Sequence, residues 1–130
     1  MEAENRAYVE EVIDFMELEP YRKHTVGSLA YGIQKRVEVA RALTLGPQVL
    51  LLDEPMAGMN IEEKEDMVRF VLDIQKERNT TVVLVEHDLG VVMDISDRIY
   101  VLDFGEVIGS GEPEAVAQNP KVIEAYIGEE

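Results

Sequence analysis

The stretch QVLLLDEP, residues 48–55, decides the fold class of this chain. Its aliphatic residues fall on both faces of an extended segment, so the pattern predicts a strand buried on both sides. The stretch TTVVLVE, residues 80–86, predicts a second strand of the same kind. Because helical patterns lie before and between these strands, we expect an α/β fold with a parallel, doubly wound sheet.

The segments around the two strands complete this pattern. Apolar residues at helical spacing, Pro and Gly breaks, and a capping-box pattern at Asn60 and Glu63 set the expected boundaries. The strand over 98–104 is expected to turn at Gly105 into a hairpin. The expected helices cover 4–17, 33–45, 61–78, 88–95 and the segments after Pro113 and Pro120, with a connector over 21–28.

Composition excludes several classes of protein. The net charge of −15 repels nucleic acid, so no nucleic-acid partner is expected, and a nucleotide site would need compensating dipoles, lysines or magnesium. The longest aliphatic runs, 49–52 and 82–85, are too short to span a bilayer, and the acidic N-terminal stretch lacks the apolar core of a secretory signal. The absence of cysteine fits a cytoplasmic protein.

Acidic residues follow both predicted strands. Asp53-Glu54 comes after the first strand, and Glu86-His87-Asp88 comes after the second. Parallel strands end at one edge of a sheet, where ligands bind. A carboxylate at a strand tip can hold hydrated magnesium, and the next residue can face a reacting phosphate. The structural alternatives are that the acids only cap the strand and that the histidine is solvated.

A third feature lies upstream, in LAYGIQKR, residues 29–36. Gly32 at the start of a helix leaves backbone N–H groups and the positive end of the helix dipole open to an anion. The structural alternative is a tight entry turn with Tyr31 packed against the domain. In the same structural alternative, Lys35, Arg36 and Arg41 form a solvated helix face.

Taken in order, these motifs resemble the second half of an ATP-binding-cassette (ABC) ATPase. The family's signature loop, LSGGQ before a basic helix, is similar to residues 29–36, and its Walker B strand is similar to VLLLDEP. Its D-loop is similar to AGMN at 57–60, and its switch histidine is similar to His87. The stretch EHDLGVVMDISDRIYVLDFGEVIGSGEP and the ending NPKVIEAYIGEE resemble the branched-chain amino-acid uptake ATPases, with urea-uptake and lipopolysaccharide-export ATPases as alternatives.

The sequence departs from the family pattern in three places. Ala30 replaces the signature serine and Ile33 replaces the usual glutamine or glutamate, so we expect a weaker phosphate contact. No G-x-x-x-x-G-K-[ST] loop is present, so the β- and γ-phosphates have no cradle in these residues. The resemblance therefore implies the distal part of a P-loop NTPase fold, mainly a parallel sheet with flanking helices, that lacks the Walker A half. By itself such a chain is not expected to hydrolyse ATP.

The resemblance also implies an organisation and a set of roles. One partial domain would span 1–130, with the end of the helical subdomain and the signature helix at 1–46, the catalytic core at 47–111 and C-terminal helices at 112–130. Asp53 would position magnesium through water, Glu54 would act as general base, and His87 would sense the γ-phosphate. The residues that would face a nucleotide on a second protomer are Ala30, Tyr31, Gly32 and Gln34, with Gly58 and Asn60 at the dimer seam.

ATP and magnesium are the implied cofactors, and both need the other half of the fold for tight binding. The implied partners are a second ATPase protomer and transmembrane permease subunits, at the cytoplasmic face of the cell membrane. A second hypothesis is a non-catalytic remnant or interaction module that pairs with a complete ATPase or with a separate N-terminal half. The uncovered flank of the sheet predicts an exposed apolar surface and self-association.

Overall fold

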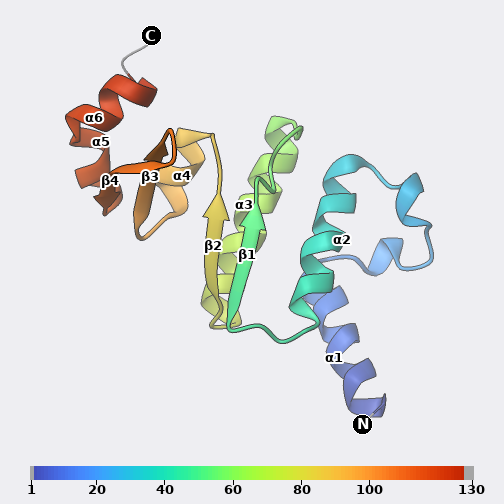
Figure 1. Ribbon diagram of the computed structural model, residues 1–130. Coiled ribbons are helices and arrows are strands. Elements are labelled where there is room, and N and C mark those ends of the chain that lie inside the picture. The colour runs from blue at the N-terminus through green and yellow to red at the C-terminus, as the bar shows by residue number, and fades with distance from the viewer. Residues whose placement is uncertain (1, 128–130) are drawn as a thin grey trace. The chain divides into compact units, whose positions relative to one another are not determined.

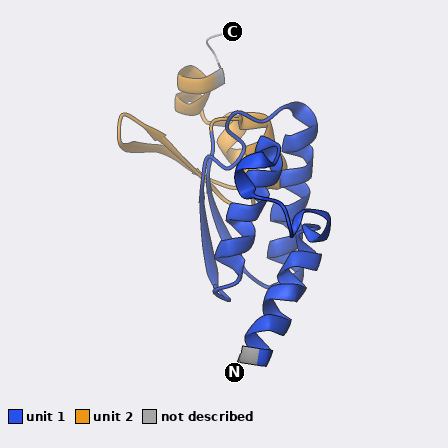
Figure 2. Cartoon of the chain, turned by 90° about the vertical axis from the view of Figure 1, so that its right-hand side faces the viewer, with its two compact units in different colours: residues 1–86 blue, residues 87–130 orange. Residues whose placement is uncertain are grey.

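The computed structural model describes residues 2–127 of the chain. These residues form two compact units, which divide between Glu86 and His87 (Figure 2). The first unit contains α1 (Glu2–Phe15), two single-turn 3-10 helices (Glu19–Tyr21 and Val26–Ser28), α2 (Tyr31–Leu43), β1 (Val49–Asp53), α3 (Ile61–Glu77) and β2 (Thr81–Val85) (Figure 1). The second contains α4 (Leu89–Ile95), β3 (Ile99–Asp103), β4 (Glu106–Gly111), α5 (Pro113–Gln118), α6 (Pro120–Val122) and a π-helical turn (Ile123–Ile127). Among residues 2–127, no helix combines the length and apolar character that crossing a bilayer requires.

β1 and β2 pair in parallel, with Val49 opposite Thr81 and Asp53 opposite Val85. The connection between them runs through α3, which makes a β-α-β unit. This arrangement confirms the expected α/β class and the parallel pairing of the two strands. The expected connector over 21–28 instead contains the two single-turn helices, and α2 begins two residues before the predicted start at residue 33.

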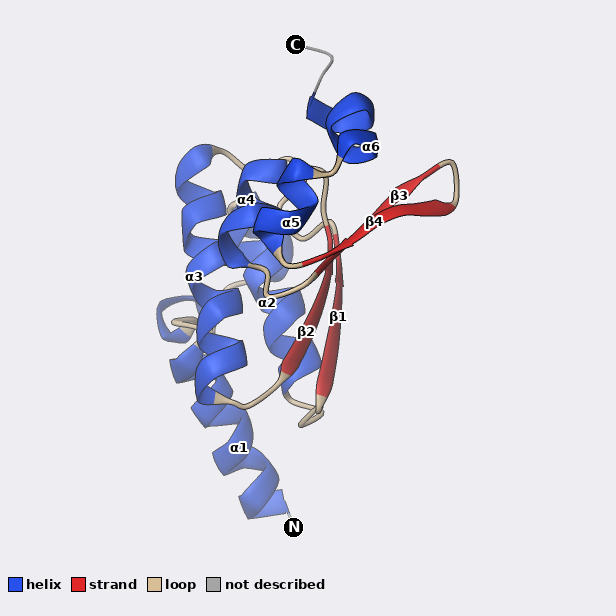
Figure 3. Cartoon of the chain, turned by 90° about the vertical axis from the view of Figure 1, so that its left-hand side faces the viewer, coloured by secondary structure: helices blue, strands red, loops and turns tan. Residues whose placement is uncertain are grey.

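The prediction that both strands are buried on both sides is wrong. Residues of β1 alternate between buried and exposed, so Leu50 and Leu52 are buried while Leu51 is 72% exposed. Val83 and Val85 of β2 are also exposed. The physical reason is that α1, α2 and α3 all lie on one side of β1 and β2 (Figure 3). The exposed apolar surface expected for an uncovered flank is confirmed.

The core of the first unit forms where α3 meets the covered face of the strands. The apolar residues of α3 recur at helical spacing and form one stripe along the helix. Burying each such side chain stabilises the fold by about 1.5–3 kcal/mol. The buried residues of α3 are Met67, Phe70, Val71 and Ile74. α2 contributes Val39, Ala40 and Leu43, whereas Val37 is only half-buried.

Polar contacts attach α1 to the rest of the first unit. The Tyr8 hydroxyl donates a 2.9 Å hydrogen bond to the Leu43 carbonyl at the end of α2. Arg78, just after α3, pairs with Glu11 at 2.5 Å. A second ion pair joins Arg69 of α3 to Glu17, two residues after the end of α1, at 2.6 Å. Two ion pairs therefore connect α1 and the turn after it to α3 and the residue that follows α3.

The second unit is built around an antiparallel hairpin of β3 and β4. Phe104 and Gly105 have φ values of 49° and 78°, which fit the two-residue turn of a hairpin with positive φ at both positions. The predicted hairpin is therefore confirmed, as are the short helices before and after it. The core of this unit consists of Ile99, Val101, Val116 and Val122.

Candidate functional site

The tip of β1 places the predicted Walker B acids. Asp53 is the last residue of the strand and is exposed, and Glu54 follows it half-buried. The Glu54 N–H donates a 2.8 Å hydrogen bond to the Val85 carbonyl at the end of β2. Glu54 has φ of 48°, a left-handed conformation that costs a non-glycine residue of order 1–3 kcal/mol. Such strain clusters at functional sites, and here neighbouring strands hold it in place.

The acid that ends β2 lies at the same edge. The Glu86 carboxylate accepts a 3.4 Å hydrogen bond from the Met56 N–H, two residues beyond Glu54. The expected meeting of the two strand ends is therefore confirmed for Glu86. Asp88 caps α4 by accepting from the Val91 N–H at 3.3 Å, which is a structural role. His87 is the first residue of the second unit, and its approach to the other acids stays a prediction.

The exposed carboxylate at the β1 tip matches the way in which proteins hold magnesium in nucleotide sites. Mg²⁺ in nucleotide sites keeps several waters and takes one or two protein carboxylates. The exposed Asp53 carboxylate suits that mode of binding. Over the part of the chain that the structure describes, no three His, Cys, Asp or Glu residues gather to hold an ion directly. The donor set therefore fits a hydrated ion that phosphate oxygens complete.

The predicted signature loop runs into α2, with Ala30 as the N-cap residue. Ala30 has no side-chain acceptor, so it caps no first-turn N–H group. The Gly32 N–H instead donates a 2.6 Å hydrogen bond to Oε2 of Glu63 on α3. The prediction that this helix start is open is therefore wrong, because a carboxylate of the same chain occupies it. The side-chain amide of Gln34 donates a 2.9 Å hydrogen bond from Nε2 to the Leu29 carbonyl and so stabilises the loop.

Glu63 is the site residue whose full role the sequence did not reveal. Its capping box is confirmed, since its N–H donates to Asn60 Oδ1 at 2.8 Å and its Oε1 accepts from the Asn60 N–H at 3.1 Å. Its second oxygen reaches Gly32 from 31 residues away. A Cβ on Gly32 would lie 2.3 Å from that oxygen, which explains why glycine is needed for this approach.

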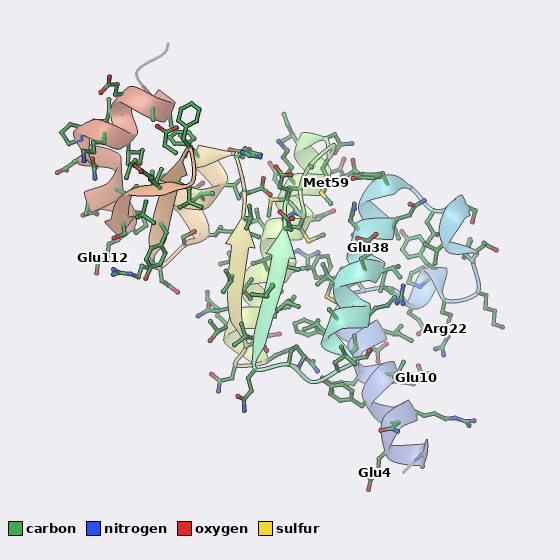
Figure 4. The ribbon with its side chains drawn as sticks, viewed as in Figure 1. Glu4, Glu10, Arg22, Glu38, Met59 and Glu112 are labelled. Carbon is green, nitrogen blue, oxygen red and sulfur yellow. The ribbon has the colours of Figure 1, made fainter. Side chains whose placement is uncertain are left out.

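The turn before α3 lies beside the signature loop. Gly58 has φ of 77°, and a Cβ there would lie 3.4 Å from Cε1 of the Tyr31 ring. The Lys35 ammonium is 5.4 Å from the centroid of the same ring. A hydrogen bond to Glu38 raises the pKa of Lys35 above its usual value. Tyr31 of the predicted signature loop therefore lies beside Gly58 of the predicted D-loop. Figure 4 labels Met59 in the same turn and Glu38 on α2.

A cavity of about 430 Å³ opens between the start of α2 and the first turns of α3. Three carboxylates line it, from Glu62, Glu63 and Asp66, against the single guanidinium of Arg36. Arg36 is not part of a solvated face. Its guanidinium lies 4.7 Å from the centroid of the Phe70 ring and 3.9 Å from Asp66. The cavity is therefore acidic, although a helix start forms one wall.

Comparisons with known proteins place these features in a class. The family model described as "ABC transporter" matches residues 2–57. The ADP conformation of MJ1267, an ATP-binding cassette of an ABC transporter, is 32% identical with a TM-score of 0.85, and covers 97% of this chain and 51% of that chain. The structure of cbiO1 from Clostridium perfringens, part of the ABC transporter complex cbiONQ, is 31% identical with a TM-score of 0.85. The match covers 95% of this chain and 49% of that chain. The chain therefore belongs to the ABC transporter ATP-binding family and has part of the P-loop NTPase fold of that family, as predicted.

Within that family, the chain is similar to branched-chain amino-acid transport ATP-binding proteins. The family model "Branched-chain amino acid ATP-binding cassette transporter" matches residues 106–130. Two similar proteins are high-affinity branched-chain amino acid transport ATP-binding proteins. BraF of Pseudomonas aeruginosa is 41% identical over 98% of this chain and 50% of its own length, and LivG of Escherichia coli K12 is 46% identical over 78% and 40%. The chain spans about half the length, or less, of the curated relatives it matches. Residues 106–130 thus match the C-terminal domain of branched-chain amino-acid ABC transporters.

Proposed function

We propose that this chain supplies the signature loop, Walker B strand and switch histidine of the ATP-hydrolysing subunit of an ABC importer for branched-chain amino acids. The observation that carries the proposal is the tip of β1, where Asp53 ends the strand and β2 holds the Glu54 backbone at 2.8 Å. The printed names of BraF and LivG support the choice of cargo. Urea-uptake and lipopolysaccharide-export systems are the alternatives for the transported substrate.

Two acids at this tip divide the catalytic work in the proposal. Asp53 holds magnesium through water, and the bound ion supplies charge neutralisation at the phosphates of ATP. Glu54 accepts a proton from the attacking water at its carboxylate. Its half-buried position lets the side chain face a bound phosphate while the backbone stays fixed to β2. His87, which follows β2 after one residue, contacts the γ-phosphate in this scheme.

A second protomer completes the site. In the proposal, residues 1–46 end the helical subdomain, 47–111 form the catalytic core and 112–130 are C-terminal helices. The contact of Tyr31 with Gly58 supports a common surface for signature loop and D-loop. The residues that face the nucleotide of the second protomer, or lie at the seam, are Ala30, Tyr31, Gly32, Gln34, Gly58 and Asn60. ATP binds to a Walker A loop outside these 130 residues, in the same protein or in a separate chain.

The proposed partners are a second ATPase protomer and transmembrane permease subunits. The proposed location is the cytoplasmic face of the cell membrane. One observation favours a second function, that of an interaction module without catalysis. Leu51, Val83 and Val85 form an exposed apolar face on the β1–β2 sheet. Such a face is typical of a protein–protein interface, and binding another polypeptide through it requires no ATP hydrolysis.

Hydrolysis by a completed domain separates these functions. Residues 1–130 are joined to the part of E. coli LivG that this chain does not match, and phosphate release from Mg-ATP is measured. Restored hydrolysis that Glu54→Gln lowers by about 100-fold or more supports catalysis. Glu106→Gln, an exposed position on β4, removes the same charge as a matched control and leaves the rate unchanged. Hydrolysis that survives Glu54→Gln, or a folded fusion that hydrolyses nothing, contradicts the catalytic proposal and leaves the interaction module.

A further inference from the structure

Glu63 uses both of its carboxylate oxygens on backbone N–H groups of two different motifs. Oε2 accepts from Gly32 at 2.6 Å, at the start of the signature helix. Oε1 accepts from Asn60 at 3.1 Å, at the end of the D-loop. The Gly32 contact is short, as is usual for a hydrogen bond with an ionised acceptor. Glu63 therefore accepts a hydrogen bond from the same Gly32 N–H group that, in the proposed function, contacts a phosphate of the nucleotide held by the second protomer.

The start of α2 selects an anion. First-turn N–H groups of a helix have no partner within the helix, and the helix dipole favours negative charge there. Ala30 offers no side-chain acceptor for these groups. Gly32 has no Cβ to keep an oxygen away, since a Cβ would lie 2.3 Å from Glu63 Oε2. The carboxylate of Glu63 fills the place that a phosphate oxygen would take.

The neighbouring charges oppose a second anion. Glu62 and Asp66 line the same cavity, and Arg36 lies 3.9 Å from Asp66 and against the Phe70 ring. A phosphate that approaches Gly32 competes with Glu63 for one N–H group. The two anions also repel each other at close range.

We propose that Glu63 is an internal anionic occupant of the signature helix, which a nucleotide phosphate must displace before the signature loop can bind it. The identity of the phosphate as that of a nucleotide rests on the proposed function. Because Oε1 remains on Asn60, Oε2 can leave Gly32 without loss of the capping box of α3. Glu63 thus positions the signature loop while it is empty and lowers its affinity for phosphate.

The test follows the Gly32 amide by NMR in the ¹⁵N-labelled 130-residue chain, with inorganic phosphate as the probe at constant ionic strength. Glu63→Gln keeps the shape of the side chain and removes its charge. We expect phosphate to reach half-saturation at Gly32 at about tenfold lower concentration in Glu63→Gln than in the unmodified chain. Glu62→Gln is the matched control, because it lines the same cavity and loses the same charge without contacting Gly32. It should change half-saturation by less than about twofold, since solvent and salt screen it.

Equal half-saturation in the three proteins overturns the proposal, as does a Gly32 amide that no variant allows phosphate to shift. If Glu63→Gln loses its dispersed amide spectrum, Glu63→Asp serves in its place. The shorter side chain keeps the charge and withdraws it from Gly32, so phosphate should again bind more tightly than in the unmodified chain. Unchanged binding in Glu63→Asp contradicts the proposal. Because the titration needs no hydrolysis, its failure is distinct from a failure of the catalytic assignment of Glu54.

Discussion

Replacing Arg78 by methionine should destabilise the first unit by detaching α1. The Arg78 side chain is only 12% exposed, and its Nη1 lies 2.5 Å from Glu11 Oε1. Its Nη2 donates to the Tyr8 hydroxyl at 3.2 Å, and its guanidinium lies 5.0 Å from the centroid of the Phe15 ring. Burial lowers the pKa of Arg78, but the hydrogen bonds to Glu11 and Tyr8 outweigh it and raise the pKa above its usual value.

The magnitude follows from these contacts. Methionine keeps an apolar stem against the two aromatic rings, so the loss is confined to polar contacts. The ion pair is discounted to about 0.5 kcal/mol, because Glu11 is exposed. The hydrogen bond to Tyr8 adds about 1 kcal/mol and the ring contacts about 0.5–1 kcal/mol. The total of about 2 kcal/mol corresponds to a fall in melting temperature of about 6–10 °C for a chain of this size.

Circular dichroism melting, with amide hydrogen exchange over α1, measures the effect. Arg69→Met is the matched control, because Arg69 also lies over an aromatic ring, 4.5 Å from Phe70, and pairs with Glu17 at 2.6 Å. Its side chain is 47% exposed, so its loss should cost under about 1 kcal/mol. If Arg78→Met lowers the melting temperature no more than Arg69→Met and leaves exchange in α1 unchanged, the assigned role of Arg78 is wrong.

Three further predictions concern the first unit. Gly32→Ala places a Cβ 2.3 Å from Glu63 Oε2 and should break the contact, so Glu63→Gln should shift the residue-32 amide resonance in the unmodified chain but not in the Gly32→Ala background; a shift that persists in that background contradicts the contact. Leu51→Lys, on the exposed face, should change unfolding free energy by under about 0.5 kcal/mol, whereas Leu52→Ala should cost about 2–4 kcal/mol in urea denaturation; similar costs would contradict the one-sided burial. A hydrogen bond from Arg69 lowers the pKa of Glu17 below its usual value, so the stabilisation by Glu17 is present above that usual value and is lost as the pH falls through the lowered pKa. Glu17→Gln should therefore flatten the acid limb of the stability profile, and an unchanged limb argues against it.

Features that depend on neighbouring residues in the sequence were predictable. The capping box of Asn60 and Glu63 and the turn at Phe104 and Gly105 follow from side chains and backbone preferences within a few residues. The order of helices and strands followed for the same reason. These local signals sufficed to predict the α/β class. The ABC family was predicted from the resemblance of residues 29–36, 49–55 and 57–60 and of His87 to the motifs of that family.

The burial of the strands was not predictable from their own residues. Leu51 and Leu52 are equally apolar, yet one is exposed and the other is buried. Which face of a strand is covered depends on where other elements pack, and α1, α2 and α3 all lie on one side of β1 and β2 (Figure 3). A strand that is apolar on both faces indicates two faces that can be covered, and does not identify the element that covers them.

The contact between Glu63 and Gly32 was hidden for a related reason. The capping-box pattern assigned Glu63 a local role, and the helix start assigned Gly32 an anion. The two patterns lie 31 residues apart, and only the packing of α2 against α3 brings them together. Sequence reasoning identified an anion-binding helix start, and the structure shows that its present occupant is a side chain of the same protein.

The most direct test of the account is a calorimetric titration with Mg-ATP. These 130 residues carry the proposed catalytic and signature groups but no phosphate cradle. We therefore expect no saturable binding below millimolar ATP for the chain alone, and micromolar binding once the unmatched part of LivG completes the domain. Micromolar binding by the chain alone, or a completed and folded domain that binds no ATP, would contradict this expectation.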